Sequence, residues 1–214
     1  MNLLIMGGPG AGKGTMSAKI LEKYHVQHIS TGDIFRSEIA NQTELGMLAK
    51  SYMDKGFLVP DEVTNPMVKS FLEKCDHSHG YLLDGYPRTL DQAKTFDELT
   101  KGTELAIDRV LTLEIDFDAL AGRITGRRIC KKCGAIYHTE SHPSTIEGIC
   151  DVCGGELFQR ADDTVESLTV RLDEYSKSTA PVLDFYEAKG IVYSINANQD
   201  IDDVWNDTQK ALEN

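Results

Sequence analysis

The chain has 214 residues, of which 41% are hydrophobic and 26% charged, and this composition predicts one main globular domain with insertions. The formal net charge of −12 argues against a general nucleic-acid-binding or membrane-surface protein, because both of those partners are anionic. No stretch approaches the ~20 apolar residues of a membrane span, and the opening MNLLIMGG lacks the basic start of a secretion signal, so we expect a cytoplasmic protein.

A glycine-rich motif follows the first apolar run. Residues 3–6 (LLIM) predict a buried strand, and residues 7–15 read GGPGAGKGT. Gly7, four intervening residues, Gly12 and Lys13 form the frame of a phosphate-binding loop. Glycines there let backbone N–H groups approach an anion, and the lysine adds a full charge. A helical pattern after the loop completes the order strand, loop, helix, which disfavours the alternative of an ordinary glycine-rich turn.

Apolar runs that predict buried strands recur along the chain. They lie at residues 3–6, 28–30, 81–84, 110–115 and 191–195, with helical patterns between them. This alternation predicts an α/β fold with a doubly wound parallel sheet. Ligands bind such sheets at the carboxyl ends of the strands, and the polar motifs STGDIFR and DGYPR follow the second and third runs.

Two segments interrupt the alternation. The first predicts helices over residues 34–42 and 44–56, with Thr31 or Asp33 as a cap and Pro60 closing the segment. The second, residues 122–159, is rich in turn formers and predicts a small β-type module.

A helical pattern resumes after this module and runs to a stop at Lys189 and Gly190. Asp162 and Asp163 precede it, and we favour helix capping and support of nearby arginines over an acid/base pair. The acidic run at residues 200–203 predicts the first turn of the last helix.

Four of the five cysteines form a metal-site pattern. Two C-x2-C pairs are separated by sixteen residues, and their cysteines are Cys130, Cys133, Cys150 and Cys153. This spacing predicts a structural zinc site rather than two redox pairs or free thiols, because four thiolates complete a tetrahedron and leave no open position. His138 and His142 are competing ligands, which the four cysteines make unnecessary. The run CDHSH at residues 75–79 could form a second metal site but more simply predicts a polar loop.

Together these motifs resemble the adenylate kinase family. The resemblance rests on GGPGAGKGT, TGDIFR, LLDGYPRT, GRR at residues 126–128 and VRL at residues 170–172, in family order over nearly the whole chain. The cysteine module is similar to the zinc-binding lid of the long bacterial form. The resemblance implies a P-loop nucleoside monophosphate kinase fold and reversible phosphoryl transfer from MgATP to AMP, giving two ADP. It also implies a monomer.

The same resemblance implies a division of the chain into three parts. Residues 1–29, 60–121 and 161–214 are expected to form the core, residues 30–59 a mobile AMP-binding domain and residues 122–160 a mobile lid. The lid segment carries six basic and four acidic side chains, whereas the rest of the chain is strongly acidic. A positive flap over an acidic body suits a polyanionic substrate, and guanidinium groups match phosphate oxygens in bidentate geometry.

The family motifs also imply roles for individual residues. The implied contacts with ATP are Gly8, Gly10, Gly12, Lys13, Gly14, Thr15, Arg123 and Arg127. The implied contacts with AMP are Thr31, Arg36, Phe57, Val59, Gly85, Arg88 and Gln92, with Gln92 at the adenine edge. The implied catalytic set is Lys13, Arg88, Arg123, Arg160 and Arg171.

Magnesium binding is expected at the same site, with one departure from the general loop motif. That motif places Ser or Thr directly after the lysine, whereas this chain has Gly14 there and Thr15 one residue later. An indirect contact between Thr15 and Mg²⁺ is therefore expected, and Asp84 is the candidate to orient water around the ion.

Two alternatives remain open. A UMP- or CMP-type kinase would share the phosphate machinery and differ in the acceptor pocket. A zinc-ribbon interaction protein would need a basic, aromatic face on the cysteine module, and Tyr137 and Phe158 with two lysines fall short of that.

Overall fold

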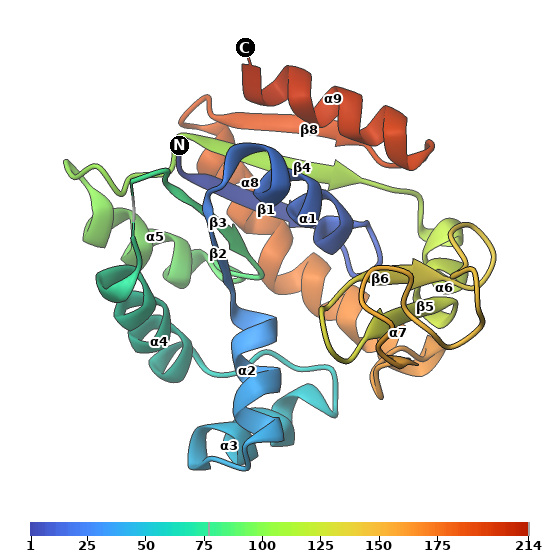
Figure 1. Cartoon of the computed structure of the whole chain (residues 1–214). Helices are drawn as coiled ribbons and strands as arrows, with labels where there is room; N and C mark the ends of the chain where they lie inside the picture. Colours follow the sequence, from blue (N-terminus) through green and yellow to red (C-terminus); the bar gives the residue numbers. More distant parts are fainter. Residues whose placement is uncertain (77, 214) are drawn as a thin grey trace.

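The computed structural model describes residues 1–76 and 78–213, with no side chains described at positions 117 and 118. Its central feature is a parallel sheet whose strands lie in the order β2-β3-β1-β4-β8 (Figure 1). The strands are β1 (Leu3–Gly7), β2 (Gln27–Ser30), β3 (Tyr81–Asp84), β4 (Arg109–Glu114) and β8 (Val192–Asn196). All five predicted strands are confirmed, with bounds that differ by one residue at some ends.

Helices cover both faces of this sheet. They are α1 (Lys13–Tyr24), α4 (Asp61–Lys74), α5 (Leu90–Thr100), α8 (Ala180–Glu187) and α9 (Ile201–Glu213). Alternate residues of β1 point to opposite faces, as the period of two requires. Leu4 and Met6 pack in a core with α4, α5 and α8, while Leu3 and Ile5 pack with α1 and α9. Burial on both faces explains why β1 reads as one continuous apolar run.

The segment after β2 forms two helices, α2 (Thr31–Ala40) and α3 (Glu44–Met53), which project from one end of the sheet (Figure 1). The predicted cap at Thr31 or Asp33 is wrong. Ser30 caps α2, because its Oγ accepts a hydrogen bond from the backbone N–H of Asp33, and Thr31 is already the first helical residue.

The cysteine module is a small antiparallel sheet joined to the core by α6 (Phe117–Thr125). Its strands are β5 (Arg127–Cys130), β6 (Ile136–His138) and β7 (Leu157–Phe158), in the order β6-β5-β7. The predicted β-type module is therefore confirmed. Strand β6 lies over the glycine-rich loop, since a Cβ on Gly14 would lie 2.9 Å from Cδ1 of Ile136.

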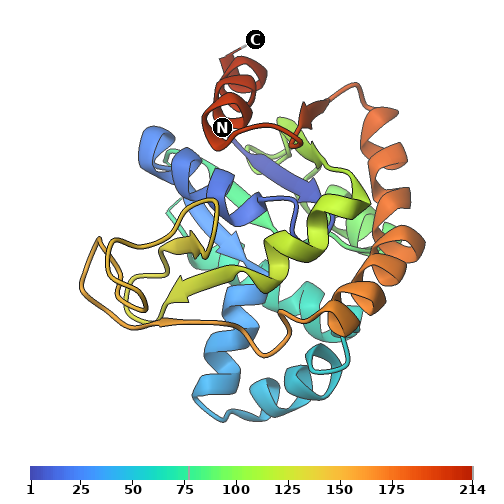
Figure 2. The ribbon, with the colours of Figure 1, turned by 90° about the vertical axis from the view of Figure 1, so that its right-hand side faces the viewer.

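The helix predicted after this module is interrupted once. It begins as α7 (Val165–Glu174), passes through a π-helical segment, η1 (Tyr175–Thr179), and continues as α8, forming one long rod along the side of the molecule (Figure 2). Asp162 and Asp163 do not cap α7, because Thr164 does so through its side chain. The local apolar spacing carries no signal for the π turn, so the sequence predicts an uninterrupted helix.

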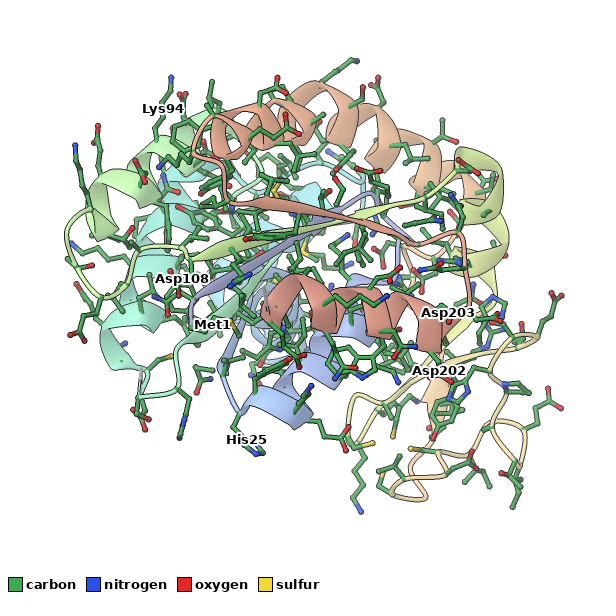
Figure 3. All side chains as sticks on the ribbon, turned by 90° about the horizontal axis from the view of Figure 1, so that it is seen from above. Met1, His25, Lys94, Asp108, Asp202 and Asp203 are labelled. Atoms are coloured by element: carbon green, nitrogen blue, oxygen red, sulfur yellow. The ribbon has the colours of Figure 1, made fainter. Side chains whose placement is uncertain are left out.

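The last helix begins as predicted, with Asp202 and Asp203 in its first turn, where negative charge complements the helix dipole (Figure 3). No helix in the described part of the chain is both long and apolar enough to cross a bilayer.

Candidate active site

The glycine-rich loop connects β1 to α1 at the carboxyl end of the sheet. Gly12 is the N-cap of α1 with a φ of 98°, a left-handed conformation that suits glycine. Lys13 is the first helical residue, and its Nζ donates hydrogen bonds to the carbonyls of Gly7 at 2.7 Å and Gly8 at 2.9 Å. The ammonium therefore folds back over its own loop, next to the helix N-terminus that would receive a phosphate.

The electrostatic environment of Lys13 is unusual for a lysine. Burial lowers its pKa to about 8; Asp84 opposes this shift, and Arg88 and Arg171 add to it through charge repulsion. Asp84 is the last residue of β3, directly beside β1 in the sheet. The loop thus holds a cation whose charge a bound polyphosphate would stabilise.

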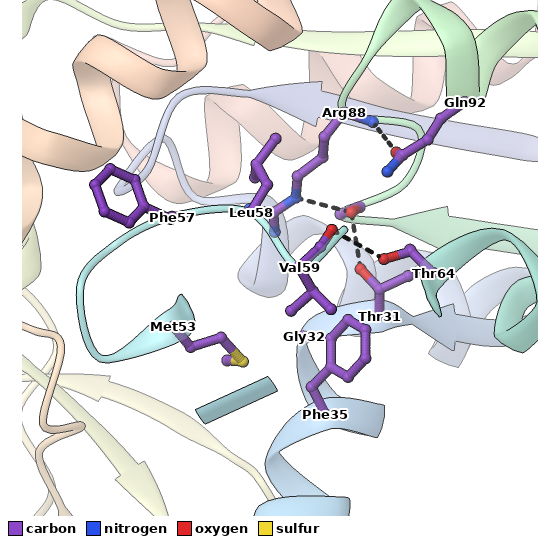
Figure 4. A pocket seen from close by; sticks show the side chains of 11 residues that line it. Thr31, Gly32, Phe35, Met53, Phe57, Leu58, Val59, Thr64, Arg88 and Gln92 are labelled. Atoms are coloured by element: carbon purple, nitrogen blue, oxygen red, sulfur yellow. Dashed lines mark hydrogen bonds between the residues drawn. The ribbon is translucent and has the colours of Figure 1, made fainter. Parts of the chain in front are cut away.

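A pocket lies between α2, the segment after α3 and the loop after β3 (Figure 4). Its apolar lining is Phe35, Met53, Phe57, Leu58 and Val59. Its polar side chains are Thr31, Thr64, Arg88 and Gln92. Such a mix of apolar walls and few polar groups is typical of a small-molecule site.

The floor of this pocket is built around the carbonyl of Gly85. Thr31 Oγ1 and Arg88 Nε both donate to it at 2.8 Å (Figure 4). Gly85 has a φ of 79°, and a Cβ there would lie 2.9 Å from both Arg88 Nη2 and Thr31 Oγ1. Glycine at this position allows the threonine and the arginine to approach each other.

Gln92 is held firmly at the edge of the pocket. Its side chain is buried, its Oε1 accepts from the backbone N–H of Arg88 at 2.7 Å, and its Nε2 donates to Asp61 at 2.6 Å. Within the described part of the chain, these bonds use one of the two amide hydrogens of Gln92, which leaves the other for a ligand.

A second pocket adjoins the first. Lys13, Arg171, Tyr175 and Thr179 line it, and Gly85 and Arg88 line both pockets. The predicted ATP-side lysine and the predicted AMP-side arginine therefore line the same pocket.

Two of the predicted arginines are paired with the aspartates that precede α7. Arg127 donates bidentate hydrogen bonds from Nε and Nη2 to the carboxylate of the buried Asp163. Arg171 donates to the carboxylate of Asp162 at 3.1 Å. The expected support of arginines by these two aspartates is therefore seen, although their expected capping role is not.

Asp33 connects two further arginines. It pairs with Arg36 on α2, and its Oδ1 lies 3.8 Å from Nη2 of Arg160, which follows β7. Burial alone would raise the pKa of Asp33, but Arg36, the Ser30 hydroxyl and Arg160 outweigh it and lower the pKa.

The arginines also repel one another. Burial, together with the charges of Arg36 and Arg127, lowers the pKa of Arg160 to about 10. Burial and the neighbouring Arg171 likewise lower the pKa of Arg88. Like charges crowded at the carboxyl end of a parallel sheet create a strong positive field, which a polyanionic ligand would relieve.

The four predicted metal ligands lie together. The sulfurs of Cys130, Cys133, Cys150 and Cys153 are all within 4.8 Å of one another. Cys130 Sγ and Cys153 Sγ are 3.5 Å apart, and Cys133 Sγ and Cys150 Sγ are 3.6 Å apart. Tetrahedral zinc with bonds of ~2.3 Å requires sulfur separations of about 3.8 Å, so the residues fit this ion.

The other candidate ligands do not join this cluster. His138 makes hydrogen bonds with backbone groups of Gly122, Glu140 and Ser141, and His142 stacks on Tyr137. In the run at residues 75–79, His77 lies outside the described residues, and the described members form no metal-ligand group.

Comparison with known proteins gives the family. The adenylate kinase family model matches residues 5–191. The chain belongs to this family. Adenylate kinases of Streptococcus thermophilus are 53% identical over 214 residues, covering 99% of this chain and 98% of theirs. Those of Caldanaerobacter subterraneus subsp. tengcongensis and Bacillus licheniformis are 49% and 50% identical over 212 residues, covering 99% of this chain and 96% and 98% of theirs.

Eight of the seventeen implied site residues line the two pockets, and Gly8, Gly10, Gly12, Gly14 and Thr15 of the glycine-rich loop are not among them. Six of the seven residues implied for AMP line the first pocket, and Arg36 lies beside it, with Nη2 2.9 Å from where a Cβ on Gly32 would be. Arg123, Arg127 and Arg160 do not line these two pockets. Arg123 Nη2 instead donates to the carbonyl of Ala197 at 2.9 Å.

Sequence reasoning missed several residues that shape the site. Asp33 stands within TGDIFR at helical spacing from Arg36, so its pairing could have been anticipated. Asp61, which holds Gln92 and the Thr89 hydroxyl, is distant in sequence and gives no such signal. Thr179 is also distant in sequence from its partner, the carbonyl of Arg88, to which its Oγ1 donates at 2.9 Å.

Proposed function

We propose that the chain catalyses reversible transfer of the terminal phosphoryl group of MgATP to AMP, giving two ADP. One observation carries the proposal: two adjoining pockets share Gly85 and Arg88, and only one of them contains the lysine of the phosphate-binding loop. A donor and an acceptor nucleotide can therefore meet end to end. Membership of the adenylate kinase family supports ATP and AMP as these nucleotides.

The chemical step needs positioning and charge neutralisation rather than a protein nucleophile. An oxygen of the AMP phosphate attacks the γ-phosphorus of ATP, and the bond from that phosphorus to the β–γ bridging oxygen breaks. No general base is required, because the AMP phosphate is already anionic. Lys13 is assigned to the β- and γ-phosphates, and Arg88, Arg123, Arg160 and Arg171 to the charge that develops around the transferring group.

The nucleotides are assigned to the loop and to the first pocket. On the ATP side, Gly10, Gly12, Gly14, Thr15 and Arg127 join Lys13 and Arg123. On the AMP side, Thr31, Arg36, Phe57, Val59, Gly85, Arg88 and Gln92 form the acceptor site. The apolar wall would cover the base, and the free amide hydrogen of Gln92 would meet its edge.

Two metals belong to this proposal. Magnesium, when bound with ATP, would supply positive charge that neutralises phosphate oxygens. Asp84 is assigned to orient water around the ion, and Thr15 to contact it indirectly. Zinc on the four cysteines has a structural role, because four thiolates leave no position for a substrate.

The domain organisation is part of the same proposal. Residues 30–59 would move as the AMP-binding domain and residues 122–160 as the lid, over a core of residues 1–29, 60–121 and 161–214. Closure of the lid would exclude water from the transferring phosphoryl group. We expect the enzyme to act as a cytoplasmic monomer without a nucleic-acid or membrane partner.

A coupled assay of ADP formation with MgATP and AMP, UMP, CMP or GMP tests the proposal. A strong preference for AMP is expected. Preference for a pyrimidine monophosphate would replace the substrate by that of a UMP- or CMP-type kinase. No transfer to any acceptor would favour a zinc-ribbon interaction protein instead.

A further inference from the structure

Tyr137 joins the cysteine cluster to the strand that covers the glycine-rich loop. It is the middle residue of β6, and its side chain is buried with Cys130 and Cys150 in the small core of the lid. Its hydroxyl oxygen lies 3.4 Å from Cys150 Sγ and 2.9 Å from the backbone nitrogen of Asp151. One hydroxyl thus contacts a candidate metal ligand and the residue that follows it.

The direction of these two hydrogen bonds is fixed by chemistry. The backbone N–H of Asp151 can only donate, so the Tyr137 oxygen accepts from it. The hydroxyl hydrogen is then available for the sulfur of Cys150. A metal-bound thiolate carries no proton, so within the proposed zinc site Tyr137 must be the donor and Cys150 the acceptor.

The neighbouring residue connects this contact to the nucleotide loop. Side chains alternate along a strand, so Ile136 points away from the face that Tyr137 occupies. Ile136 lies against Gly14 of the loop, with Cδ1 2.9 Å from where a Cβ would stand on that glycine. Strand β6 therefore holds the metal cluster on one face and the phosphate-binding loop on the other.

We propose that Tyr137 is a positioning residue of the zinc site, whose hydroxyl donates to the Cys150 thiolate and anchors β6 to the metal. This inference rests on the proposed zinc site. Partners of this kind orient metal ligands and retain the metal, and their loss costs about 10-fold to 100-fold in metal affinity.

The test compares the wild-type chain with Tyr137→Phe, which removes one oxygen and keeps the ring. Zinc content is measured first, followed by the rate of zinc transfer to a chromophoric chelator. Release that is about 10-fold to 100-fold faster from Tyr137→Phe is expected. Tyr193→Phe is the matched control, because it makes the same chemical change in the core strand β8, and its release should equal that of wild type.

A spectroscopic measurement separates the thiolate contact from the Asp151 contact. In cobalt-substituted protein, the sulfur-to-cobalt charge-transfer band should move to lower energy in Tyr137→Phe, because a thiolate without its donor is the better electron donor. Unchanged zinc release would overturn the inference, and so would faster release with an unmoved band. A wild-type chain without zinc would instead refute the zinc site itself.

Discussion

Lys13 both braces the glycine-rich loop through hydrogen bonds and provides a buried positive charge. Its ammonium donates to two carbonyls of its own loop, while burial and two neighbouring arginines lower its pKa to about 8. Asp84 attracts this ammonium, whereas the surrounding arginines repel it. Phosphate groups would add negative charge, so the residue is prepared for a polyanion.

Replacing Lys13 with methionine should remove this charge and leave the fold intact. We expect kcat to fall by at least about 100-fold, the typical cost of one charge-stabilising group. The thermal midpoint should stay near that of wild type, because the lysine makes no contribution to the apolar core. Steady-state kinetics with calorimetric melting checks both expectations, and a near-normal kcat would remove Lys13 from the catalytic set.

The low pKa of Lys13 also predicts linkage between ATP binding and protons. A polyphosphate favours the charged form and raises this pKa, so binding near pH 8.5 should take up a proton. Affinity should therefore decline as the pH rises above about 8. Calorimetric titration in two buffers of different ionisation enthalpy measures the uptake. Lys13→Arg stays protonated and should lose the uptake; equal uptake in that variant would assign the proton to another group.

Among the elements, the cysteine module has a small apolar core and would depend most on a bound metal for its stability. Its buried cluster consists of Cys130, Tyr137 and Cys150, with a few partly buried neighbours. A sheet of three short strands with so small a core is marginal by itself, and a metal that crosslinks four cysteines can stabilise it. A metal held by the paired cysteines can thus compensate for the small apolar core that these short strands form.

Cys130→Ser should therefore destabilise the lid. We expect a loss of about 2 kcal/mol or more, corresponding to a fall of roughly 5 °C in the melting temperature, together with loss of zinc. Cys75→Ser is the control, because Cys75 lies outside the cluster. Scanning calorimetry with metal analysis measures both variants, and equal melting of Cys130→Ser and wild type would deny the zinc its structural role.

At the scale of the whole molecule, the site is assembled from parts that are distant in the chain. Arg36 belongs to α2, Arg88 to the loop before α5, Arg127 to β5 and Arg171 to α7. Asp33 pairs with Arg36 of its own helix, α2, and also lies near Arg160, which follows strand β7 of the cysteine module. The positive field over the two pockets therefore depends on how α2, α3 and the cysteine module lie on the core.

The proposed closure of residues 30–59 and 122–160 over the core predicts slow hydrolysis of ATP in the absence of AMP. With no AMP bound, the proposed acceptor site would stay open and the arginines would not surround the γ-phosphate, so hydrolysis should be far slower than transfer to AMP. Phosphate release measured with and without AMP decides the point. Hydrolysis as fast as transfer would show that the lid does not exclude water.

The order of strands and helices could be predicted from the sequence because its causes are local. Buried strands such as residues 3–6 are continuous apolar runs, and the glycine-rich loop and the paired cysteines are defined by spacing within a few residues. The residues that cap the starts of helices could not be predicted in the same way. Ser30 and Thr164 cap helices for which the sequence predicted neighbouring residues as caps, and the choice depends on backbone angles that no spacing rule gives.

The tertiary structure alone decided which of these local features meet. It placed Asp61 against Gln92, Thr179 against Arg88 and Tyr137 against Cys150, none of which is specified by a local pattern. The sequence by itself therefore determined the glycine-rich loop, the paired cysteines and the α/β order. The shape of the acceptor pocket and the pairing of the arginines depend on long-range packing, because their contacts join groups whose positions only the folded sheet and its helices bring together.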